Sequence, residues 1–478
     1  MYLDNKTTFI KRDIIARIAR LYFEDTLIEE INKIPIKMIK NEDTPNRCCI
    51  YKDREIIKYR AIAIMGFSLE NEYEIDNNLL SDYAKIALER EKPTFPILTF
   101  IDDACRSCVR TNYFITNACR NCVAKPCIVN CPKKSISVEN NQAQIDAATC
   151  VNCGVCMKVC PYHAVVYVPV PCEESCPVGA IIKDDKGKED IDYSKCIFCG
   201  KCVRACPFGA IMEKSQIIDV IKHIKNGSTI VAMIAPSIVA QFEVNLNKIV
   251  DAIKKLGFSY VVECALGADI TAEIEAKEFL ERIGKGDKLM GTSCCPAYTE
   301  AVKKHSTDFI PFVSHAKTPM QYTADLVSEE YPDSIKVFIG PCIAKKHEGL
   351  DYKNIDYALT YEELSALFIA RGIDPESCVE APLDLKEATN IGRGFPSTGG
   401  VSQGVGKLLK GEEVELKPVI IDGFTRQNVR LLNVYAKGNC PGNLVEVMSC
   451  EGGCIAGPGV IMKYSTAKKK LEDFIKKH

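Results

Sequence analysis

The sequence predicts a multidomain protein that combines the α/β and α+β classes, with mostly parallel sheets in its C-terminal half. Its 478 residues exceed what one core of ordinary size holds. The stretch from Cys105 to Cys206 is rich in cysteine, proline and short turns instead of long amphipathic periods. Beyond about residue 215, apolar runs typical of buried strands alternate with helical stretches, which is the pattern of a parallel α/β sheet.

Composition and charge argue against several classes of protein. Lys and Arg number 61 and Asp and Glu number 63, so the net charge of −2 indicates neither a nucleic-acid partner nor a membrane surface. The polar residues 1–6 lack the apolar core of an export signal, and no run approaches the roughly 18 apolar residues that span a bilayer. We therefore expect a cytoplasmic protein. Its 26 cysteines are then better explained as metal ligands than as disulfides.

Residues 1–100 are expected to form a small N-terminal domain of unknown role. The stretch Asp13–Ile31 has a helical pattern, and the run Ala61–Met65 has the composition of a short strand. Adjacent Cys48 and Cys49 are interpreted as thiols of a small core, with metal ligation as the alternative.

Residues 101–215 contain a repeated cysteine pattern. Two copies of C-x2-C-x2-C-x3-C-P have the spacing of the bacterial [4Fe–4S] run, in which three thiolates bind one cluster and the fourth cysteine binds another. A zinc ribbon is the alternative, but zinc pairs do not need the x3-Cys-Pro extension. The repeat therefore predicts a ferredoxin-like domain with several [4Fe–4S] clusters. The two runs are Cys150/Cys153/Cys156/Cys160 and Cys196/Cys199/Cys202/Cys206.

Three further pieces of this pattern bring the cysteines to sixteen, the ligand count of four [4Fe–4S] clusters. Three clusters, without the pair Cys105-x2-Cys108, remain the alternative. Two pairings of the runs are open. Either neighbouring runs share clusters, or the pairing is nested. In the nested pairing the first run (119–131) joins the last (196–206), and the middle run (150–160) joins the fragment at Cys172 and Cys176. The added pieces are the looser run Cys119/Cys122/Cys127/Cys131, the fragment Cys172-x3-Cys176, and the pair Cys105 and Cys108.

Residues 216–478 carry three short, Gly- and Pro-bounded cysteine segments. They read TSCCPAY at Thr292–Tyr298, GPCIAKKHE at Gly340–Glu348 and EVMSCEGGCIAGPG at Glu446–Gly459. These resemble, in order, the [FeFe]-hydrogenase signatures TSCCPxW, xPCxxKxxE and ExMxCxxGCxxGxG. The resemblance extends from about residue 105 to the C-terminus. It implies a two-lobed α/β catalytic domain, with lobes at about 216–345 and 346–478.

What the resemblance implies for this domain is an H-cluster. This cofactor is a [4Fe–4S] cube joined through a cysteine sulfur to a diiron subcluster with CO, cyanide and azadithiolate ligands. Cys454 would be the bridging ligand, and Cys294 would donate protons to the bridgehead amine, with a buried inert thiol as the alternative. Four thiolates also satisfy one cube on chemical grounds alone. By motif position they are Cys295, Cys342, Cys450 and Cys454.

The resemblance also implies residues that hold the cofactor. Lys345 would donate a hydrogen bond to one cyanide, and Glu348 would anchor Lys345 or its loop. The segment Ala235-Pro236-Ser237 resembles the part of the family that holds the other cyanide. Met448, in the third signature, is a further candidate cofactor-binding residue.

A proton relay is the last catalytic feature that the resemblance implies. Glu275, Glu278 and Arg282 have helical spacing that places them on one face. Without the resemblance they would be interpreted as a solvated salt-bridge stripe. The family's relay matches these residues and includes a hydroxyl at the position of Ser314.

Some residues depart from the family pattern or lie outside it. Tyr298 stands in place of Trp, Gly340 in place of Met and Met320 in place of Gln, which indicates a divergent subgroup. No motif includes three other cysteines, which are interpreted as structural thiols, with Cys440 as a weak candidate ligand. They are Cys264, Cys378 and Cys440.

The predicted function is reversible reduction of protons to H₂, with electrons relayed through [4Fe–4S] clusters. Ferredoxin is the expected electron partner, protons and H₂ are the substrates, and maturation proteins would supply the diiron site. A hydrogen- or redox-sensing protein with low turnover is the first alternative. A non-catalytic iron–sulfur assembly protein is the second.

Overall fold

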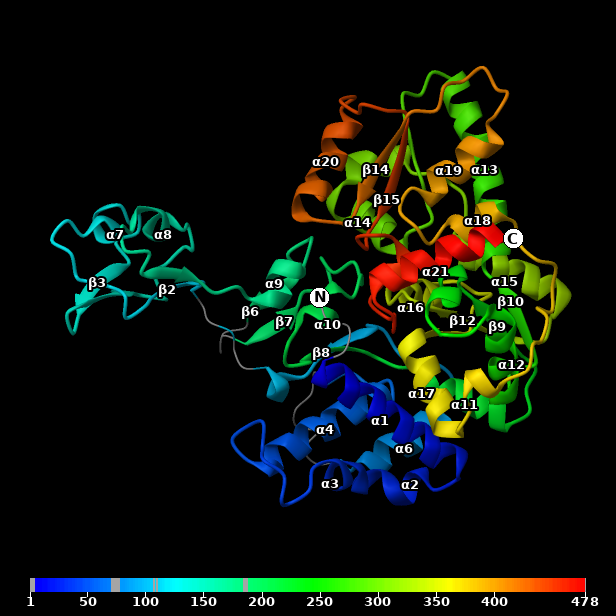
Figure 1. Ribbon diagram of the computed structural model, residues 1–478, viewed down its shortest axis with the longest axis horizontal. Helices are drawn as coiled ribbons and strands as arrows, with labels where there is room; N and C mark the ends of the chain where they lie inside the picture. The colour runs from blue at the N-terminus through cyan, green and yellow to red at the C-terminus, as the bar shows by residue number, and fades with distance from the viewer. Residues whose placement is uncertain (1–4, 70–77, 106–107, 109–110, 184–187, 478) are drawn as a thin grey trace.

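The computed structural model describes residues 5–69, 78–105, 108, 111–183 and 188–477. Residues 1–4, which contribute to the prediction of a cytoplasmic location, lie outside the described residues. Figure 1 shows a helical N-terminal part, a cysteine-rich part and a larger part with two sheets. Among the described residues, every helix is too short or too polar to cross a membrane.

The N-terminal part is built from helices. Asn5 caps the first helix by accepting a hydrogen bond from the Thr8 backbone N–H. The run Ala61–Met65 is not a strand but forms the end of a helix and its C-cap. All five residues are buried, and periodicity alone does not distinguish a short, fully buried helical segment from a strand. The helices are α1 (Lys6–Phe23), α2 (Leu27–Glu30), α3 (Ile34–Met38), α4 (Ile50–Ile64) and α6 (Leu80–Glu89).

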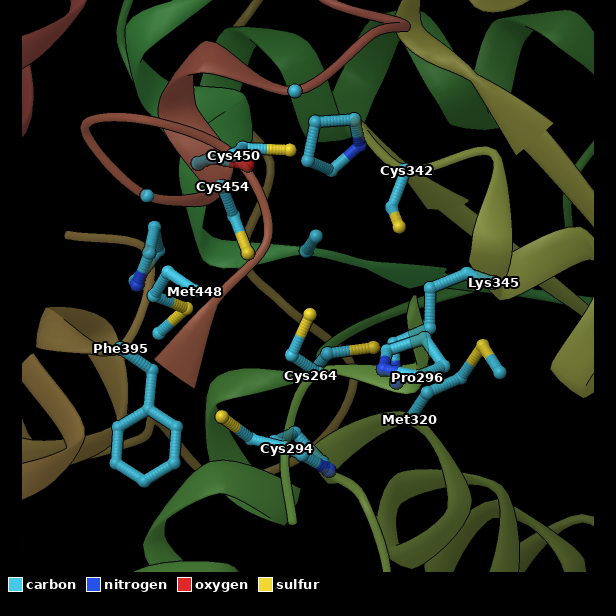
Figure 2. Close-up of a pocket in the computed structure, with 18 of the residues that line it drawn as sticks. Cys264, Cys294, Pro296, Met320, Cys342, Lys345, Phe395, Met448, Cys450 and Cys454 are labelled. Atoms are coloured by element: carbon cyan, nitrogen blue, oxygen red, sulfur yellow. The ribbon is translucent and has the colours of Figure 1, made fainter. Parts of the chain in front are cut away.

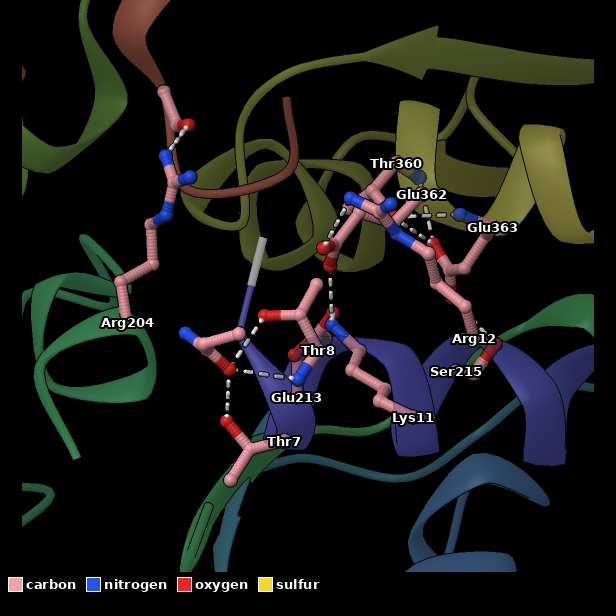
Figure 3. Close-up of polar contacts among 12 residues, drawn as sticks. Thr7, Thr8, Lys11, Arg12, Arg204, Glu213, Ser215, Thr360, Glu362 and Glu363 are labelled. Carbon is pink, nitrogen blue, oxygen red and sulfur yellow. Dashed lines mark hydrogen bonds and ion pairs between the residues drawn. The ribbon is translucent and has the colours of Figure 1, made fainter. Parts of the chain in front are cut away.

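Helix α1 joins the N-terminal part to the rest of the chain. It packs against α17 (Tyr361–Arg371) of the C-terminal part. Lys11 forms ion pairs with Glu213 and, at 2.8 Å, with Glu362 (Figure 3). Burial opposes the charge of Lys11, but the two carboxylates raise its pKa above the ordinary value. Residues 1–100 are therefore anchored by a buried charge cluster instead of standing apart.

The cysteine-rich part consists of two modules with the same topology, each with a pair of antiparallel strands and a hairpin. In the outer module β1 pairs with β8, and β6 forms a hairpin with β7. In the inner module β2 pairs with β5, and β3 forms a hairpin with β4. The outer strands are β1 (Leu98–Phe100), β6 (Ile181–Lys183), β7 (Glu189–Ile191) and β8 (Ile211–Glu213); the inner strands are β2 (Tyr113–Ile115), β3 (Ile136–Glu139), β4 (Gln142–Ile145) and β5 (Val165–Tyr167).

The inner module is an insertion in the sequence of the outer module, and the two names refer to this nesting in the sequence instead of to depth in the molecule. It begins after the outer strand β1 and ends before α9, and in Figure 1 it stands to the left of the remaining chain. Strand β1 lies before residue 101, so the outer module crosses the boundary predicted at 100/101. Each module has two short helices, α7 (Pro126–Val129) and α8 (Val155–Val159) in the inner, α9 (Pro171–Ser175) and α10 (Lys201–Ala205) in the outer.

The C-terminal part contains a four-stranded parallel sheet with the strand order β10-β9-β12-β13. Every residue of β9 is buried, as expected for a central parallel strand. The strands predicted around residues 230, 260 and 335 are confirmed. The sheet comprises β9 (Ile230–Ile234), β10 (Tyr260–Glu263), β12 (Ile335–Gly340) and β13 (Tyr357–Thr360), with helices α11 (Ile217–Lys225), α12 (Leu246–Leu256), α13 (Ala265–Gly284), α15 (Pro319–Glu330), α16 (Ala344–Asp351) and α17.

A second parallel sheet has the order β11-β15-β14 and includes the strand predicted at Val419–Ile421. The sheets do not follow the predicted lobe boundary at 345/346, because β13 completes the first sheet and β11 belongs to the second. Parallel neighbours are joined by long crossovers, so sequence position does not fix sheet membership. The elements are β11 (Met290–Gly291), β14 (Pro418–Asp422), β15 (Leu444–Met448), α14 (Pro296–His305), α18 (Asn390–Gly394), α19 (Gly400–Leu408), α20 (Arg426–Ala436) and α21 (Tyr464–Lys477).

A buried ion pair between α16 and α17 gives a stability prediction. Lys346 Nζ lies 2.7 Å from Glu363 Oε1, and both side chains are 1% exposed. Changing Lys346→Met leaves the Glu363 carboxylate buried without its cation, so we expect the free energy of unfolding to fall by about 3–5 kcal/mol. Denaturant unfolding measures this change. Lys469→Met, at an exposed position, is the control, and a loss in Lys346→Met as small as the control's would contradict the prediction.

Candidate functional site

The three cysteine segments of the C-terminal part meet in one cavity (Figure 2). Its walls include the predicted ligands and cofactor-binding residues Ala235, Pro236, Ser237, Cys294, Cys295, Cys342, Lys345, Met448, Cys450 and Cys454. The segments follow β11, β12 and β15, and the APS segment follows β9. The carboxyl ends of parallel strands are where α/β folds place ligand sites, and here two sheets contribute to the same site.

The four predicted ligands are partly buried and line the same cavity. Burial, then the neighbouring thiols of Cys454 and Cys295, raise the pKa of Cys342 above its ordinary value. Burial and Cys295 likewise raise the pKa of Cys454 to about 12, and burial with the thiols of Cys342 and Cys454 raises that of Cys450 well above the ordinary value. Such thiols ionise readily only with a cationic group among them. The donor set therefore fits one [4Fe–4S] cube.

The thiols do not surround a single point. Among the residues that the structure describes, no group of three or more His, Cys, Asp or Glu side chains is placed to hold one metal ion. A [4Fe–4S] cube binds each thiolate at a different iron, so its ligands do not need to meet at one ion.

Cys294 faces the same cavity but is not needed to complete four ligands. Burial, then the nearby Glu275 carboxylate and the Cys295 thiol, raise its pKa well above the ordinary value. The Sγ atom of Cys294 therefore carries a proton at neutral pH. A protonated thiol at the cavity wall can donate that proton to a bound group.

Lys345 is the cation of the cavity wall. Its Nζ donates a hydrogen bond to Glu348 Oε2 at 2.6 Å, and burial, which opposes the charge, is outweighed by Glu348, so that the pKa of Lys345 is raised. Thr318 Oγ1 donates to the other Glu348 oxygen at 2.7 Å. Glu348 therefore has the anchoring position that was predicted. Thr318 was not predicted as a site residue, although a Thr-Pro pair at a helix start is a typical N-cap signal.

The APS segment is held by a residue that the sequence did not indicate. Ser237 Oγ and the Tyr361 hydroxyl lie 2.7 Å apart, and the Tyr361 hydroxyl donates to the Ala235 carbonyl at 3.2 Å. Tyr361 is fully buried at the start of α17. Its hydroxyl fixes the strand end that carries Ala235 and Ser237 at the cavity.

Phe338 explains why residue 340 is glycine. A Cβ atom at Gly340 would lie 2.4 Å from the Phe338 ring and 3.1 Å from the Ala235 Cβ. The Phe338 ring lines the cavity, as does Met320. The Phe338 ring therefore occupies the space that a side chain at position 340 would need. A motif that considers position 340 alone does not reveal this. Tyr298 is fully buried beside Phe424 in the neighbouring core instead of lining the cavity.

This packing predicts the effect of Gly340→Ala. The added methyl group forces the Phe338 ring to move in a closely packed region, so we expect a loss of about 1–3 kcal/mol in the free energy of unfolding. Thermal and denaturant unfolding measure the loss. The double variant Phe338→Ala, Gly340→Ala removes the clash, and its loss is expected to be smaller than the sum of the two single losses. Additive losses would contradict this explanation.

The relay candidates occupy one side of α13 but divide into two groups. Glu275 is fully buried and accepts hydrogen bonds from the Ser293 backbone N–H at 2.8 Å and from Ser293 Oγ at 3.1 Å. Burial raises the pKa of Glu275 to about 8. Since Ser293 precedes Cys294, these bonds place Glu275 close to the cavity wall that Cys294 forms. A solvated salt-bridge stripe does not describe it.

Glu278 belongs to a network that reaches the surface. It accepts a hydrogen bond from Ser314 Oγ at 2.6 Å and pairs with Arg282 at 2.6 Å and with His315 Nδ1 at 2.8 Å. Burial opposes ionisation, but the bonds from Ser314 and His315 and the charge of Arg282 lower the pKa of Glu278. The His315 side chain is 85% exposed. His315 was missed, although a histidine beside the predicted Ser314 is a visible signal.

The cysteines outside the motifs have different surroundings. Cys264 lines the cavity, so its interpretation as a purely structural thiol is incomplete. Cys378 is buried away from the cavity, and Cys440 packs at the edge of the core that contains the second sheet. Cys48 and Cys49 lie 3.9 Å apart, with Cys48 exposed, so they are not thiols of a closed core.

The cysteine-rich modules decide between the two pairing schemes. The first and middle runs share the inner module, and the last run shares the outer module with the fragment and with Cys105 and Cys108. The nested pairing of the first run with the last is therefore wrong, because the inner module closes on itself through β2 and β5. Cys199 of the outer module lines the same cavity as Cys295. One ferredoxin-like module is thus in direct contact with the site.

Comparisons with known proteins agree with this architecture. The family model described as iron only hydrogenase large subunit, C-terminal domain, matches residues 228–458, and the 4Fe-4S binding domain matches residues 143–166 and 189–212. The periplasmic [Fe] hydrogenase large subunit of Nitratidesulfovibrio vulgaris is 29% identical over 397 residues, covering 70% of this chain and 91% of that protein.

The chain is also similar to an iron-sulfur assembly component and to a solved hydrogenase structure. Cytosolic iron-sulfur assembly component 3 of Rattus norvegicus is 24% identical over 294 residues, which cover 49% of this chain and 62% of that protein. A solved variant of apo [FeFe]-hydrogenase HydA1 from Chlamydomonas reinhardtii aligns with 51% of this chain and 84% of its own, at 21% identity and a TM-score of 0.43. The chain therefore has a C-terminal domain similar to that of iron-only hydrogenase large subunits, at residues 228–458, and 4Fe-4S binding domains that precede it.

Proposed function

We propose that the protein is a hydrogenase that reversibly reduces protons to H₂, with an H-cluster in the cavity and electrons supplied through [4Fe–4S] clusters. The observation that carries the proposal is the convergence of Cys294, Lys345 and the four ligand thiols on one cavity. Iron–sulfur binding alone requires only the four thiols. The additional proton donor and buried cation are what a catalytic site for proton reduction needs.

The predicted ligands and cofactor-binding residues of the cavity each have a role in this proposal. Cys295, Cys342, Cys450 and Cys454 would hold the cofactor through their thiolates. The Lys345 ammonium and the Ser237 segment would bind the two cyanide ligands, because a buried anion needs a charged or hydrogen-bonding partner. Met448 and Phe338 would pack against the cofactor and exclude water. When bound, the cofactor supplies the open metal position at which electrons and protons combine.

The proton path would lead from the surface through two carboxylates to Cys294 Sγ. His315, Arg282, Glu278 and Ser314 form the outer, hydrogen-bonded part, and Glu275 with Ser293 forms the inner part. The described contacts contain no direct hydrogen bond between Glu275 and the Ser314–Glu278 pair. A proton crossing between these two parts therefore requires a bridging group such as water. The raised pKa of Glu275 suits a group that both accepts and releases protons near neutral pH.

Partners and location belong to the same proposal. A ferredoxin-like carrier would exchange electrons with the modules, and maturation proteins would insert the diiron subcluster. The prediction of a cytoplasmic location rests on the sequence alone.

Two other functions are weighed against catalysis. Similarity to cytosolic iron-sulfur assembly component 3 favours an iron–sulfur assembly protein, which would need the cube but neither Cys294 nor Lys345 in the cavity. A hydrogen- or redox-sensing protein would retain the whole cofactor at low turnover. The anchored N-terminal part is the candidate for a signalling element in that case.

Infrared spectroscopy and a turnover assay on the same preparation separate the three functions. Protein matured with the diiron cofactor is expected to show CO and cyanide stretching bands and to evolve H₂ with reduced methyl viologen. Bands with negligible turnover would favour the sensor. Absence of the bands in a correctly folded, cube-containing preparation would reject both cofactor-based functions and favour assembly.

A further inference from the structure

We propose that Cys105, Cys108, Cys172 and Cys206 bind a [4Fe–4S] cluster at the junction of the two modules. We call this the junction cluster. The matched 4Fe-4S domains, residues 143–166 and 189–212, contain only one of these four cysteines. The assignment concerns this chain's cluster count and ligand sets, and it does not depend on hydrogen turnover.

The first argument is that the two modules have equivalent elements. In the inner module, Cys127 lies on α7 and Cys156 on α8; in the outer module, Cys172 lies on α9 and Cys202 on α10. Helices α7 and α9 each begin with a Pro-Cys pair, and α8 and α10 each follow a glycine with positive φ. Cys172 of the outer module therefore corresponds to Cys127 of the inner module.

The second argument is a turn that occurs four times. After each of the four Cys-Pro pairs of the cysteine-rich part, the backbone N–H of the residue four positions on donates to the cysteine Sγ, over distances of 3.1 to 3.4 Å. The residue before that donor always has a positive φ. Backbone N–H groups directed at sulfur stabilise a thiolate. The four cysteines are Cys131 and Cys160 in the inner module and Cys176 and Cys206 in the outer module.

These correspondences assign four cysteine ligands to each cluster. In the inner module Cys131 lines one cavity with Cys150, Cys153 and Cys156, which leaves Cys119, Cys122, Cys127 and Cys160 as the other set. The corresponding outer sets are Cys176, Cys196, Cys199 and Cys202, and Cys172 and Cys206 with one missing Cys-x2-Cys pair. In the inner module that pair, Cys119 and Cys122, precedes Cys127 in the chain. The outer counterpart that precedes Cys172 is Cys105 and Cys108, separated from it by the inserted module.

Spatial proximity agrees with this assignment. The Ile101 backbone N–H donates to the Ala210 carbonyl at 2.7 Å, which brings the segment that leads to Cys105 beside the turn after Cys206. Cys108 packs against the hydrophobic cluster that contains Cys172. Strand pairing and packing therefore bring the four cysteines of the junction set to the same module, although Cys105 and Cys206 are about a hundred positions apart in the sequence.

The position of the junction cluster gives the clusters an order. Thr111, three residues after Cys108, donates from Oγ1 to Cys150 Sγ of the inner module at 3.4 Å. On the other side, Cys199 belongs to the set that shares the hydrogenase cavity with Cys295. The junction cluster thus lies between the inner module and the cluster next to the cavity. Electrons that enter at the inner module pass through it.

Iron content and electron paramagnetic resonance of the cluster-loaded full chain test the assignment. The double variant Cys105→Ala, Cys108→Ala is expected to lose about four iron atoms per chain and one component of the reduced spectrum. Cys172→Ala and Cys206→Ala are expected to lose the same component. Cys176→Ala should lose a different one, even though it lies four residues from Cys172. The matched double variant Cys48→Ala, Cys49→Ala should lose neither iron nor signal.

Two results would overturn the proposal. One is unchanged iron content in the Cys105, Cys108 double variant; the other is loss of different spectral components in that variant and in Cys206→Ala. Where a variant fails to fold, the unaltered chain decides the count. Without the diiron subcluster it should hold about 20 iron atoms, as five cubes, whereas about 16 would contradict the junction cluster.

Discussion

Cys294→Ala is expected to lower H₂ turnover by about 10²- to 10⁴-fold while leaving the CO and cyanide infrared bands in place. A positioned general acid contributes a factor of this size, and Cys294 is a protonated thiol at the cavity wall, next to the ligand Cys295, that the cube does not require. The ligand thiols are unchanged in this variant, so cofactor binding persists. Hydrogen evolution with reduced methyl viologen and infrared spectra, measured on one preparation, check both parts.

Cys378→Ala is the matched control for this experiment. Cys378 is a buried thiol that lies outside the cavity, so its loss should leave turnover near the level of the unaltered protein. Turnover above about a tenth of normal in Cys294→Ala would exclude Cys294 as the proton donor. Loss of the infrared bands in Cys294→Ala would show that the residue is needed for the cofactor instead.

Glu275→Gln is expected to reduce turnover by about 10²-fold or more, because the amide keeps the hydrogen bond from Ser293 but cannot carry a proton to Cys294. The spectrum of the bound cofactor should stay unchanged. Glu273→Gln, at an exposed position on the same helix, is the control. Near-normal turnover in Glu275→Gln would remove this carboxylate from the relay.

The same carboxylate makes stability depend on pH. Its folded-state pKa of about 8 exceeds the ordinary value of 4.5, so the folded protein binds the proton more tightly than the unfolded chain does. This contribution to stability is therefore fully present below about pH 4.5 and is lost as pH rises towards 8, at about 1.4 kcal/mol per pH unit. In Glu275→Gln that slope should be absent. Equal slopes in both proteins, measured by denaturant unfolding across this range, would contradict the raised pKa.

The sequence alone was enough to identify candidate ligands and strands that are defined by residues close together in the chain. In the C-x2-C-x2-C-x3-C-P runs, the first three cysteines are so close in the sequence that they can bind one cluster whatever the rest of the fold is. The strands at residues 230, 260, 335 and 419 were predictable for a similar reason, since each is a short apolar run between turns. The run Ala61–Met65 has the same appearance and is helical, because complete burial removes the periodicity that would have distinguished it.

The tertiary structure decided what depends on residues far apart in the chain. Tyr361 beside Ser237 and Phe338 beside Gly340 belong to no motif, because each is defined by the neighbour that it contacts. The joining of Cys105 and Cys108 to Cys172 depends on the inserted module returning the chain to its starting point through β2 and β5. Sequence spacing therefore identified the candidate cluster ligands and the candidate relay residues of the proposed function. Strand pairing decided which of these residues lie together, because the sheets bring segments that are distant in the sequence to one place.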